Sequence, residues 1–141
     1  MDAPTALRQH LVDDAAVASV FGTRIYPVTF PQAPDFATGP AMTYQMVSNL
    51  TEYSHEGPAN LNEARLQFDI YAMTYAALAG AADVVRRALS GWRGTIGDPP
   101  SVDFRGVFLV NEMDWPVPET LRAGPRLLRR TIDCNVFFSA L

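Results

Sequence analysis

The stretch RLQFDIYAMTYAALAGAADVVRRALS, residues 65–90, places a strand pattern directly before a helix pattern. From Arg65 to Ala72, apolar side chains alternate with polar or aromatic ones, which is the period of a strand that buries one face. Thr74 then offers the hydroxyl of a helix N-cap, and apolar residues recur at helical spacing up to Leu89. We therefore predict a half-buried strand over residues 65–72 and a helix from Thr74 to about Ser90.

The N-terminal segment predicts two short helices joined by a bend. Leu7 and Leu11 are spaced to share one helix face. Asp13 or Asp14 offers an N-cap for the second helix, and Gly22 is placed to end it.

The rest of the chain supplies further strand patterns. They cover residues 25–26, 41–50, 102–113 and 126–138. In the last of these, Ile132 and Cys134 point inward while Thr131 and Asp133 point outward. Glycines and prolines over residues 94–100 indicate a turn. We predict one α+β domain over residues 1–141, with a mainly antiparallel sheet of about four to five strands and helices packed on one face.

Two segments rich in proline interrupt these patterns. In GTRIYPVTFPQAP, residues 22–34, a strand begins and three prolines follow, each of which removes a backbone donor and fixes φ. No strand ladder can therefore continue from Val28 to Gly39. The second segment, DWPVPETLRAGP, occupies residues 114–125. We predict that both are ordered loops.

Composition narrows the classes of function. The chain has 141 residues, of which 48% are hydrophobic and 18% charged, and its formal net charge is −4. A charged fraction below the usual ~25% indicates that partners cover part of the surface. The acidic balance disfavours tight binding to nucleic acid. All eleven basic residues are arginines.

The single cysteine and the short apolar runs predict the redox state and the cellular location of the chain. The single cysteine, Cys134, lies in an apolar alternating run, which predicts a buried thiol rather than a nucleophile. The N-terminus has no apolar stretch of signal-peptide length, and the longest apolar runs are a few residues. We expect a soluble intracellular chain with no membrane partner.

The residue types of catalytic sites do not form recognisable patterns. His10 and His55 lack companions at zinc-ligand spacing and are expected on the surface. Asp69 and Asp133 occupy the outward faces of two strands that could be neighbours. Such a pair could serve acid–base chemistry, but a solvated or partner-facing surface is the favoured interpretation. We therefore predict no catalytic residue, no cofactor and no metal, and a protein that is not an enzyme.

Four arginines form the densest basic cluster. They are Arg122, Arg126, Arg129 and Arg130. Phosphate binding and ion pairs between subunits are both compatible with this cluster. Ion pairs are favoured because no aromatic platform is interleaved and acidic residues stand nearby.

The succession of segments resembles a known family. DDAAVASVFGTRIYP, AMTYQMVSN, TEYSHEGP, the strand and helix of residues 64–89, GWRGTIGD and RLLRRTIDCNVFF are similar to segments of the small tail-completion, or tail-terminator, proteins of long-tailed phages and phage-derived gene transfer agents. The resemblance covers residues 5–138. The chain departs from the family pattern at DFATGPAM, residues 35–42, where the proline-rich segment that leads into the next strand is longer than expected.

The resemblance implies a structural role in the virion, at the tail–neck junction. In that family six α+β copies form a ring on the last tail-tube hexamer, stop tube polymerisation and offer the surface to which the head's connector binds. The implied partners are further copies of the chain, the tail tube protein and a head-completion or connector protein. DNA would pass through the ring without sequence-specific binding. Assembly would take place in the bacterial cytoplasm.

Particular residues receive expected roles from this resemblance. A ring needs head-to-tail contacts, and proline-stiffened loops present such contacts at low ordering cost. Phe30 and Trp115 are the expected aromatic anchors. The complete set expected at the subunit interface is Tyr26, Phe30, Trp115, Leu121, Arg126 and Arg129.

The turn over residues 51–60 and the two aspartates are assigned to other surfaces. Within the turn, Glu52, Tyr53, His55 and Glu56 are expected to face the tail tube. Asp69 and Asp133 are expected to line the lumen, where carboxylates would repel DNA.

Two other classes of function stay open. One is a neighbouring connector component, such as a head-completion or stopper protein. The other is a small ligand-binding domain or enzyme that uses the carboxylate face.

Overall fold

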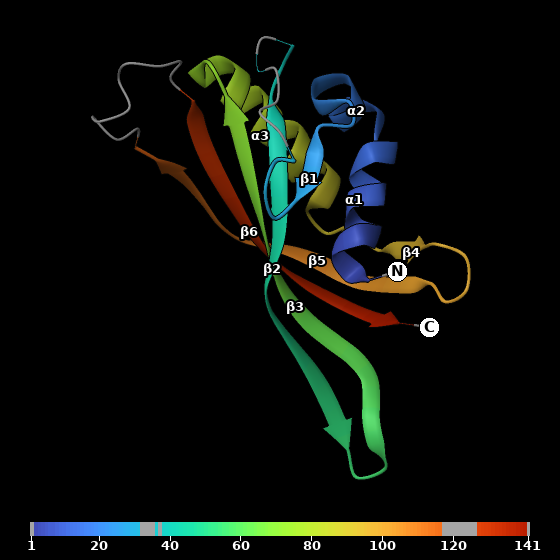
Figure 1. Ribbon diagram of the computed structural model, residues 1–141. Helices are drawn as coiled ribbons and strands as arrows, with labels where there is room; N and C mark the ends of the chain where they lie inside the picture. Colours follow the sequence, from blue (N-terminus) through green and yellow to red (C-terminus); the bar gives the residue numbers. More distant parts are fainter. Residues whose placement is uncertain (1, 32–35, 37, 117–126, 141) are drawn as a thin grey trace.

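The structure is a computed structural model that describes residues 2–31, 36, 38–116 and 127–140 (Figure 1). The elements in chain order are α1 (Ala3–Asp13), α2 (Ala15–Phe21), β1 (Ile25–Pro27), β2 (Ala41–Ser54), β3 (Gly57–Ala72), α3 (Tyr75–Leu89), β4 (Gly94–Ile96), β5 (Val102–Trp115) and β6 (Leu128–Ala140). The α+β class predicted from the sequence is confirmed.

The strands form one mixed sheet in the order β1-β2-β3-β6-β5-β4. Only β1 and β2 run parallel, so the expectation of a mainly antiparallel sheet is correct. The expected number of strands was wrong, because the described residues form six. The missed strand is β4, which lies where the sequence indicated a turn. With three residues it is too short to show alternation, and it is held by pairing with Val102, Asp103 and Phe104 of β5.

The predicted turn over residues 51–60 is mostly strand. β2 continues to Ser54 and β3 starts at Gly57, so the turn itself is reduced to residues 55–56. Thr51 Oγ1 donates to Asn62 Oδ1 at 2.8 Å across the two strands. Because β6 pairs with β3 only from Asn62 onward, the end of this hairpin extends beyond the rest of the sheet, as Figure 1 shows.

The core lies between the helices and one face of the sheet. Leu66, Phe68 and Ile70 of β3 are buried, and so are Ile132 and Cys134 of β6, as the alternation predicted. The helices pack on this face in Figure 1. The stripe of α3 predicted from the sequence is buried against it and consists of Leu78, Ala81, Ala82, Val85 and Leu89. Each large side chain buried here contributes roughly 1.5–3 kcal/mol.

Local sequence sets the helix ends. Asp14, and not Asp13, caps α2, because its carboxylate accepts from Ala16 N at 3.0 Å and Val17 N at 3.1 Å. Gly22 ends α2 with φ 58°, a conformation that glycine adopts without strain. Thr74 caps α3 by accepting from Ala77 N at 3.2 Å, as predicted.

Replacing Phe68 with alanine tests the assignment of the core. We expect Phe68→Ala to lower the free energy of unfolding by about 3–5 kcal/mol, because it leaves a cavity at the centre of the sheet. Tyr53→Ala, at the exposed end of the hairpin, is the matched aromatic control and should change it by less than about 0.5 kcal/mol. Chemical denaturation measures both, and equal effects would contradict the assignment.

Candidate assembly surface

The sheet face opposite the helices carries a row of aromatic and arginine side chains. Tyr71, Arg129 and Trp115 stand side by side on β3, β6 and β5, because Tyr71 pairs with Arg129 and Arg129 pairs with Trp115 in the strand register. Tyr26 of β1 and Phe30 of the loop after it extend the row. We call these five residues the aromatic–arginine row.

Short contacts join the members of the row. The Arg129 guanidinium lies 4.8 Å from the centroid of the Trp115 ring and 5.8 Å from that of Tyr71. The Phe30 ring meets Tyr71 edge to face at 5.3 Å and Tyr26 at 5.6 Å. Cation–π contacts of this kind contribute about 0.5–2 kcal/mol each, and edge-to-face pairs a similar amount.

Asp69 anchors the centre of the row. One of its oxygens accepts from Arg129 Nε at 3.2 Å and Nη2 at 3.1 Å, and also from the Thr131 hydroxyl. The Trp115 indole N–H donates to Thr131 Oγ1 at 2.6 Å. Asp69 therefore orients Arg129 by direct hydrogen bonds and Trp115 through the hydroxyl of Thr131.

Asp69 is buried rather than solvated on the outward face of its strand, and its expected position in the lumen of a ring stays a prediction. Its exposed fraction is 6%, and its charge is paired with Arg129. A carboxylate buried on a sheet face needs such a partner, since leaving it unpaired would be costly. Its effect on a passing polyanion is correspondingly reduced.

Asp133 lies on the same face, as predicted. β3 and β6 are neighbours, with Gln67 opposite Asp133 and Asp69 opposite Thr131. Arg65 pairs with Asp133 Oδ2 at 3.2 Å, while Asp133 Oδ1 is buried without a hydrogen-bond partner in the described part of the chain. Both aspartates thus lie beside an arginine of their own chain.

The residues expected at a subunit interface come together in part. Tyr26, Phe30, Trp115 and Arg129 all belong to the aromatic–arginine row. Trp115 is 41% exposed, whereas Phe30 is half-buried against its own sheet and also contacts Phe36 at 5.9 Å. The expected interface residues Leu121 and Arg126 lie outside the described residues.

Sequence reasoning missed Tyr71, the residue that joins the two halves of the row. Its signal was present, because Tyr71 is the one aromatic on the outward, otherwise polar face of the strand over residues 65–72. Burial raises the pKa of the Tyr71 hydroxyl, and the nearby Arg129 opposes part of this rise.

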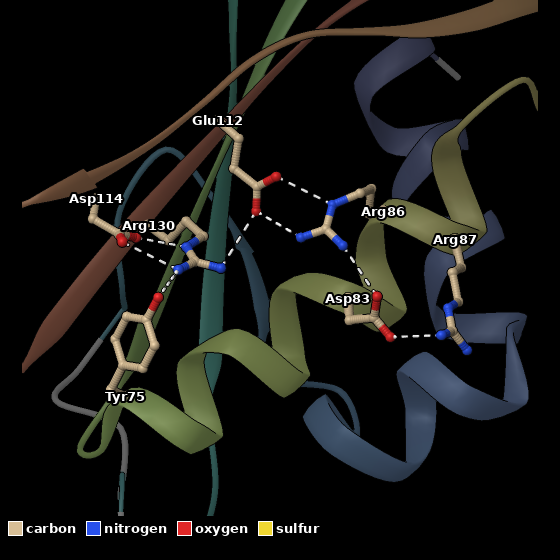
Figure 2. A network of polar contacts seen from close by, with 7 residues as sticks. All are labelled: Tyr75, Asp83, Arg86, Arg87, Glu112, Asp114 and Arg130. Carbon is tan, nitrogen blue, oxygen red and sulfur yellow. Dashed lines mark hydrogen bonds and ion pairs between the residues drawn. The ribbon is translucent and has the colours of Figure 1, made fainter.

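A second polar network lies on the helix side and ties α3 to the sheet (Figure 2). Arg130 of β6 donates to Asp114 at 2.5 and 3.1 Å, to Glu112 at 3.5 Å and to the Tyr75 hydroxyl at 3.2 Å. Arg86 of α3 donates to the same Glu112 at 2.9 and 3.1 Å. A cavity of about 270 Å³ opens between these groups.

Two members of the arginine cluster form ion pairs within the chain. Arg129 pairs with Asp69 and Arg130 with Asp114, and ion pairs of this cluster between subunits stay a prediction. The intrachain pairs result from the strand register, because it sets Arg129 next to Tyr71 and Arg130 opposite Asp114. Arg122 and Arg126 lie outside the described residues.

The residues expected to face the tail tube lie at the end of the β2–β3 hairpin. Glu52, Tyr53, His55 and Glu56 are all exposed, and Tyr53 is exposed by 73%. Leu50, on the same arm, is also exposed. The arm therefore presents apolar side chains to the outside of the chain.

The described residues contain no group of three His, Cys, Asp or Glu side chains close enough to hold a metal ion. Cys134 is free and buried, as predicted, and burial raises the pKa of its thiol to about 12. His10 was expected on the surface but is half-buried, stacked on Trp92 at 3.8 Å with its Nε2 2.9 Å from Ala88 O. Of the described helices, none has both the length and the apolar character needed to span a membrane.

Comparison with known protein families matches residues 5–133 to the family described as tail completion protein gp17. The chain belongs to this tail completion family. A comparison with curated proteins finds no match. Among solved structures, a chain of the virion of a native gene transfer agent particle has a similar fold, with a TM-score of 0.66 and 18% identity, over 98% of this chain and 93% of that one.

Family membership confirms the resemblance seen in the sequence. This tail completion protein is a structural component of a phage-type tail and hence of a virion. The match covers all helices and strands of the described structure except the first two residues of α1 and the end of β6. The aromatic–arginine row and the whole hairpin arm therefore lie within the matched residues.

Removing the Asp69 carboxylate tests its role as an anchor. In Asp69→Ala, the buried Thr131 hydroxyl loses its acceptor and Arg129 loses its partner, although Arg129 is part-exposed and regains water. We expect the free energy of unfolding to fall by about 1–3 kcal/mol. Arg87→Ala breaks the exposed Arg87–Asp83 pair and should cost no more than about 0.5 kcal/mol. If the two variants were equally stable, Asp69 would not be an anchor.

The Arg130–Asp114 pair predicts a dependence of stability on acid. The hydrogen bond from Arg130 holds the pKa of Asp114 below its ordinary value of 3.8. A carboxyl group whose pKa is lower in the folded state stabilises the protein at pH values above its pKa in the unfolded state. This stabilisation is lost as the pH falls through its pKa in the folded state. In Asp114→Asn we expect unfolding free energy to fall less between about pH 5 and pH 2 than in the wild type. Denaturant titrations at several pH values measure this slope, and parallel slopes would contradict the prediction.

Proposed function

We propose that this tail completion protein acts as a tail terminator, in which identical copies close into a ring on the end of the tail tube. The ring stops tube polymerisation and offers the surface to which a head-completion or connector protein binds. By analogy with the resemblance seen in the sequence, we propose six copies in the ring. The observation that carries the proposal is the match of residues 5–133 to the tail completion family.

The exposed hairpin arm supports a contact along the ring axis. β6 pairs with β3 only from Asn62 onward, so the end of the β2–β3 hairpin before Asn62 has no third strand beside it. No core therefore offsets the entropy lost when the backbone of this end is ordered. Leu50 and Tyr53 nevertheless remain exposed there. An apolar arm of this kind is stabilised when a partner covers it, and in this proposal the partner is the last ring of the tail tube.

The aromatic–arginine row supports a lateral contact between copies. Trp115 and Arg129 have the residue types most enriched at the centres of interfaces. Their contacts with Asp69 and Tyr71 already hold them in place, which lowers the ordering cost of binding. In this proposal the row of one copy meets a different patch of the next copy, as a closed ring requires.

The acidic balance of the chain accords with the passage of DNA through such a ring. The formal net charge is −4, and the described arginines discussed above are paired with carboxylates. Arginines paired with carboxylates attract a polyanion weakly, so in this proposal DNA passes through the ring without binding.

Two double variants separate the proposed contacts. In Leu50→Ala with Tyr53→Ala, we expect a ring of wild-type mass that no longer ends tube growth, because the arm has lost its apolar contact. In Phe30→Ala with Trp115→Ala, we expect loss of the ring, because the lateral anchors are gone. Mass measurement follows the ring, and electron microscopy of tail-tube protein polymerised with each variant follows tube length.

The same tubes distinguish the competing roles. Wild-type protein should bind one tube end and fix its length. Tubes that grow to the same length with and without the protein would overturn the terminator proposal and favour a head-completion or stopper protein. A ring that survives the Phe30 and Trp115 substitutions would remove the row from the subunit interface.

A further inference from the structure

Among the described residues, two long strand edges on opposite sides of the sheet have no neighbouring strand. β2 pairs with β3 along its length, but on its other side β1 reaches only Met42, Thr43 and Tyr44. From residue 46 to residue 54, no described strand pairs with that side. This is the β2 edge.

The second edge belongs to β5. This strand pairs with β6 along its length, but on its other side β4 reaches only Val102, Asp103 and Phe104. Gly91 N then donates to Val107 O at 2.8 Å. From residue 108 to residue 115, no described strand pairs with that side. This is the β5 edge.

Neither edge is protected by lysine, proline or a very short strand, which are among the devices that guard exposed edges. Each edge does carry a bulge and acidic side chains, Glu52 on β2 and Glu112 and Asp114 on β5. The chain has no lysine, and neither segment contains proline. Apolar side chains that are each at least 40% exposed stand on both edges: Met46, Val47, Leu50 and Tyr53 on β2, and Phe108, Val110, Met113 and Trp115 on β5.

We propose that the β2 edge of one copy pairs with the β5 edge of the next copy, so that the sheet continues from subunit to subunit. Strand directions permit this. β2 is antiparallel to β3, β3 to β6, and β6 to β5, so β2 and β5 run in opposite directions. A neighbouring copy placed with its β2 beside β5 therefore forms an antiparallel pair and repeats the alternation of the sheet.

The occupant is a second copy because each chain carries both halves of the junction. β2 and β5 are each second from an end of the strand order, next to the short strands β1 and β4, so the two open edges lie on opposite sides of the sheet and no described strand of the same copy pairs with them. A contact between two different patches repeats head to tail and closes into a ring when the rotation between copies closes. Main-chain hydrogen bonds along an added strand supply affinity without a pocket.

Bulges favour closure over a flat ribbon of subunits. The pairing register shifts at Val47 in β2 and at Val110 in β5. Bulges of this kind bend a strand and increase its twist, and they are frequent at the rims of barrels. The sheet is visibly twisted in Figure 1. Closure of the continued sheet rests on the ring proposed above, but the edge contact itself does not.

Two charged double variants each close one edge. Val47→Lys with Leu50→Lys places lysines on the β2 edge, and Val110→Lys with Met113→Lys places them on the β5 edge. Met73→Lys is the control, because Met73 is 47% exposed and lies on neither edge. Native mass spectrometry and light scattering over a range of protein concentrations measure assembly.

The expected pattern is specific to a contact between two different edges. Wild type and Met73→Lys form species larger than a dimer, and each edge variant alone is monomeric. Mixing the two edge variants restores one intact junction per pair, so the mixture forms dimers and nothing larger. Circular dichroism checks folding, and the single variants Leu50→Lys and Met113→Lys replace any double variant that does not fold.

Other outcomes overturn the proposal. Wild-type protein that stays monomeric at every soluble concentration, edge variants that assemble like the wild type, or a mixture that stays monomeric would each do so. An edge variant that assembles normally but fails to end tube growth would assign that edge to the tail tube protein. Edge variants that assemble and still end tube growth would remove the inference and leave the terminator proposal standing.

Discussion

The pairing of β3 with β6 is the constraint on which the rest of the structure depends. Its register sets Phe68 opposite Ile132 on the face that the helices cover. The same register sets Asp69 opposite Thr131 and Tyr71 opposite Arg129 on the other face. A slip by one residue would exchange the two faces, burying the arginine and exposing the core. Hydrophobic burial on one face therefore fixes the geometry of the row on the other.

The register also supplies the partners that make the buried carboxylate of Asp69 favourable and that order the side chains around it. A carboxylate that is 6% exposed is unfavourable unless its charge and lone pairs are satisfied. Arg129 and Thr131 satisfy it, and Thr131 in turn accepts from Trp115. Intrachain hydrogen bonds thus hold Trp115 and Arg129 in place before any partner binds, so the surface is preorganised.

The sequence predicted those parts of the fold that depend on side-chain periodicity. The alternation around Phe68 and Cys134, the stripe of α3 and the Thr74 cap are properties of neighbouring residues, so they were readable in advance. β4 and the length of the hairpin were not, because they depend on backbone pairing with strands distant in sequence. For the same reason the intrachain partner of Arg130 was not predicted, since only the register places it opposite Asp114.

The candidate surface was predicted in its residues but not in its connections. Tyr26, Phe30, Trp115 and Arg129 were selected for residue type and loop position, and the fold brings them together through Tyr71, which was not selected. An outward-facing tyrosine on one strand is ordinary by itself. It becomes the bridge of the row only because β6 places an arginine beside it, and such cross-strand neighbours are not visible in a single strand pattern.

The open edges and the hairpin arm offer two directions for contacts, although Leu50 and Tyr53 belong both to the β2 edge and to the arm. The open edges lie at the two sides of the sheet, where they extend it laterally, whereas the hairpin arm extends along its own strands, beyond the end of β6. An edge contact through main-chain hydrogen bonds leaves side chains on the two faces of the arm available to a further partner. A small protomer can therefore hold neighbouring copies and a further partner at the same time, because one sheet supplies both the edges and the arm.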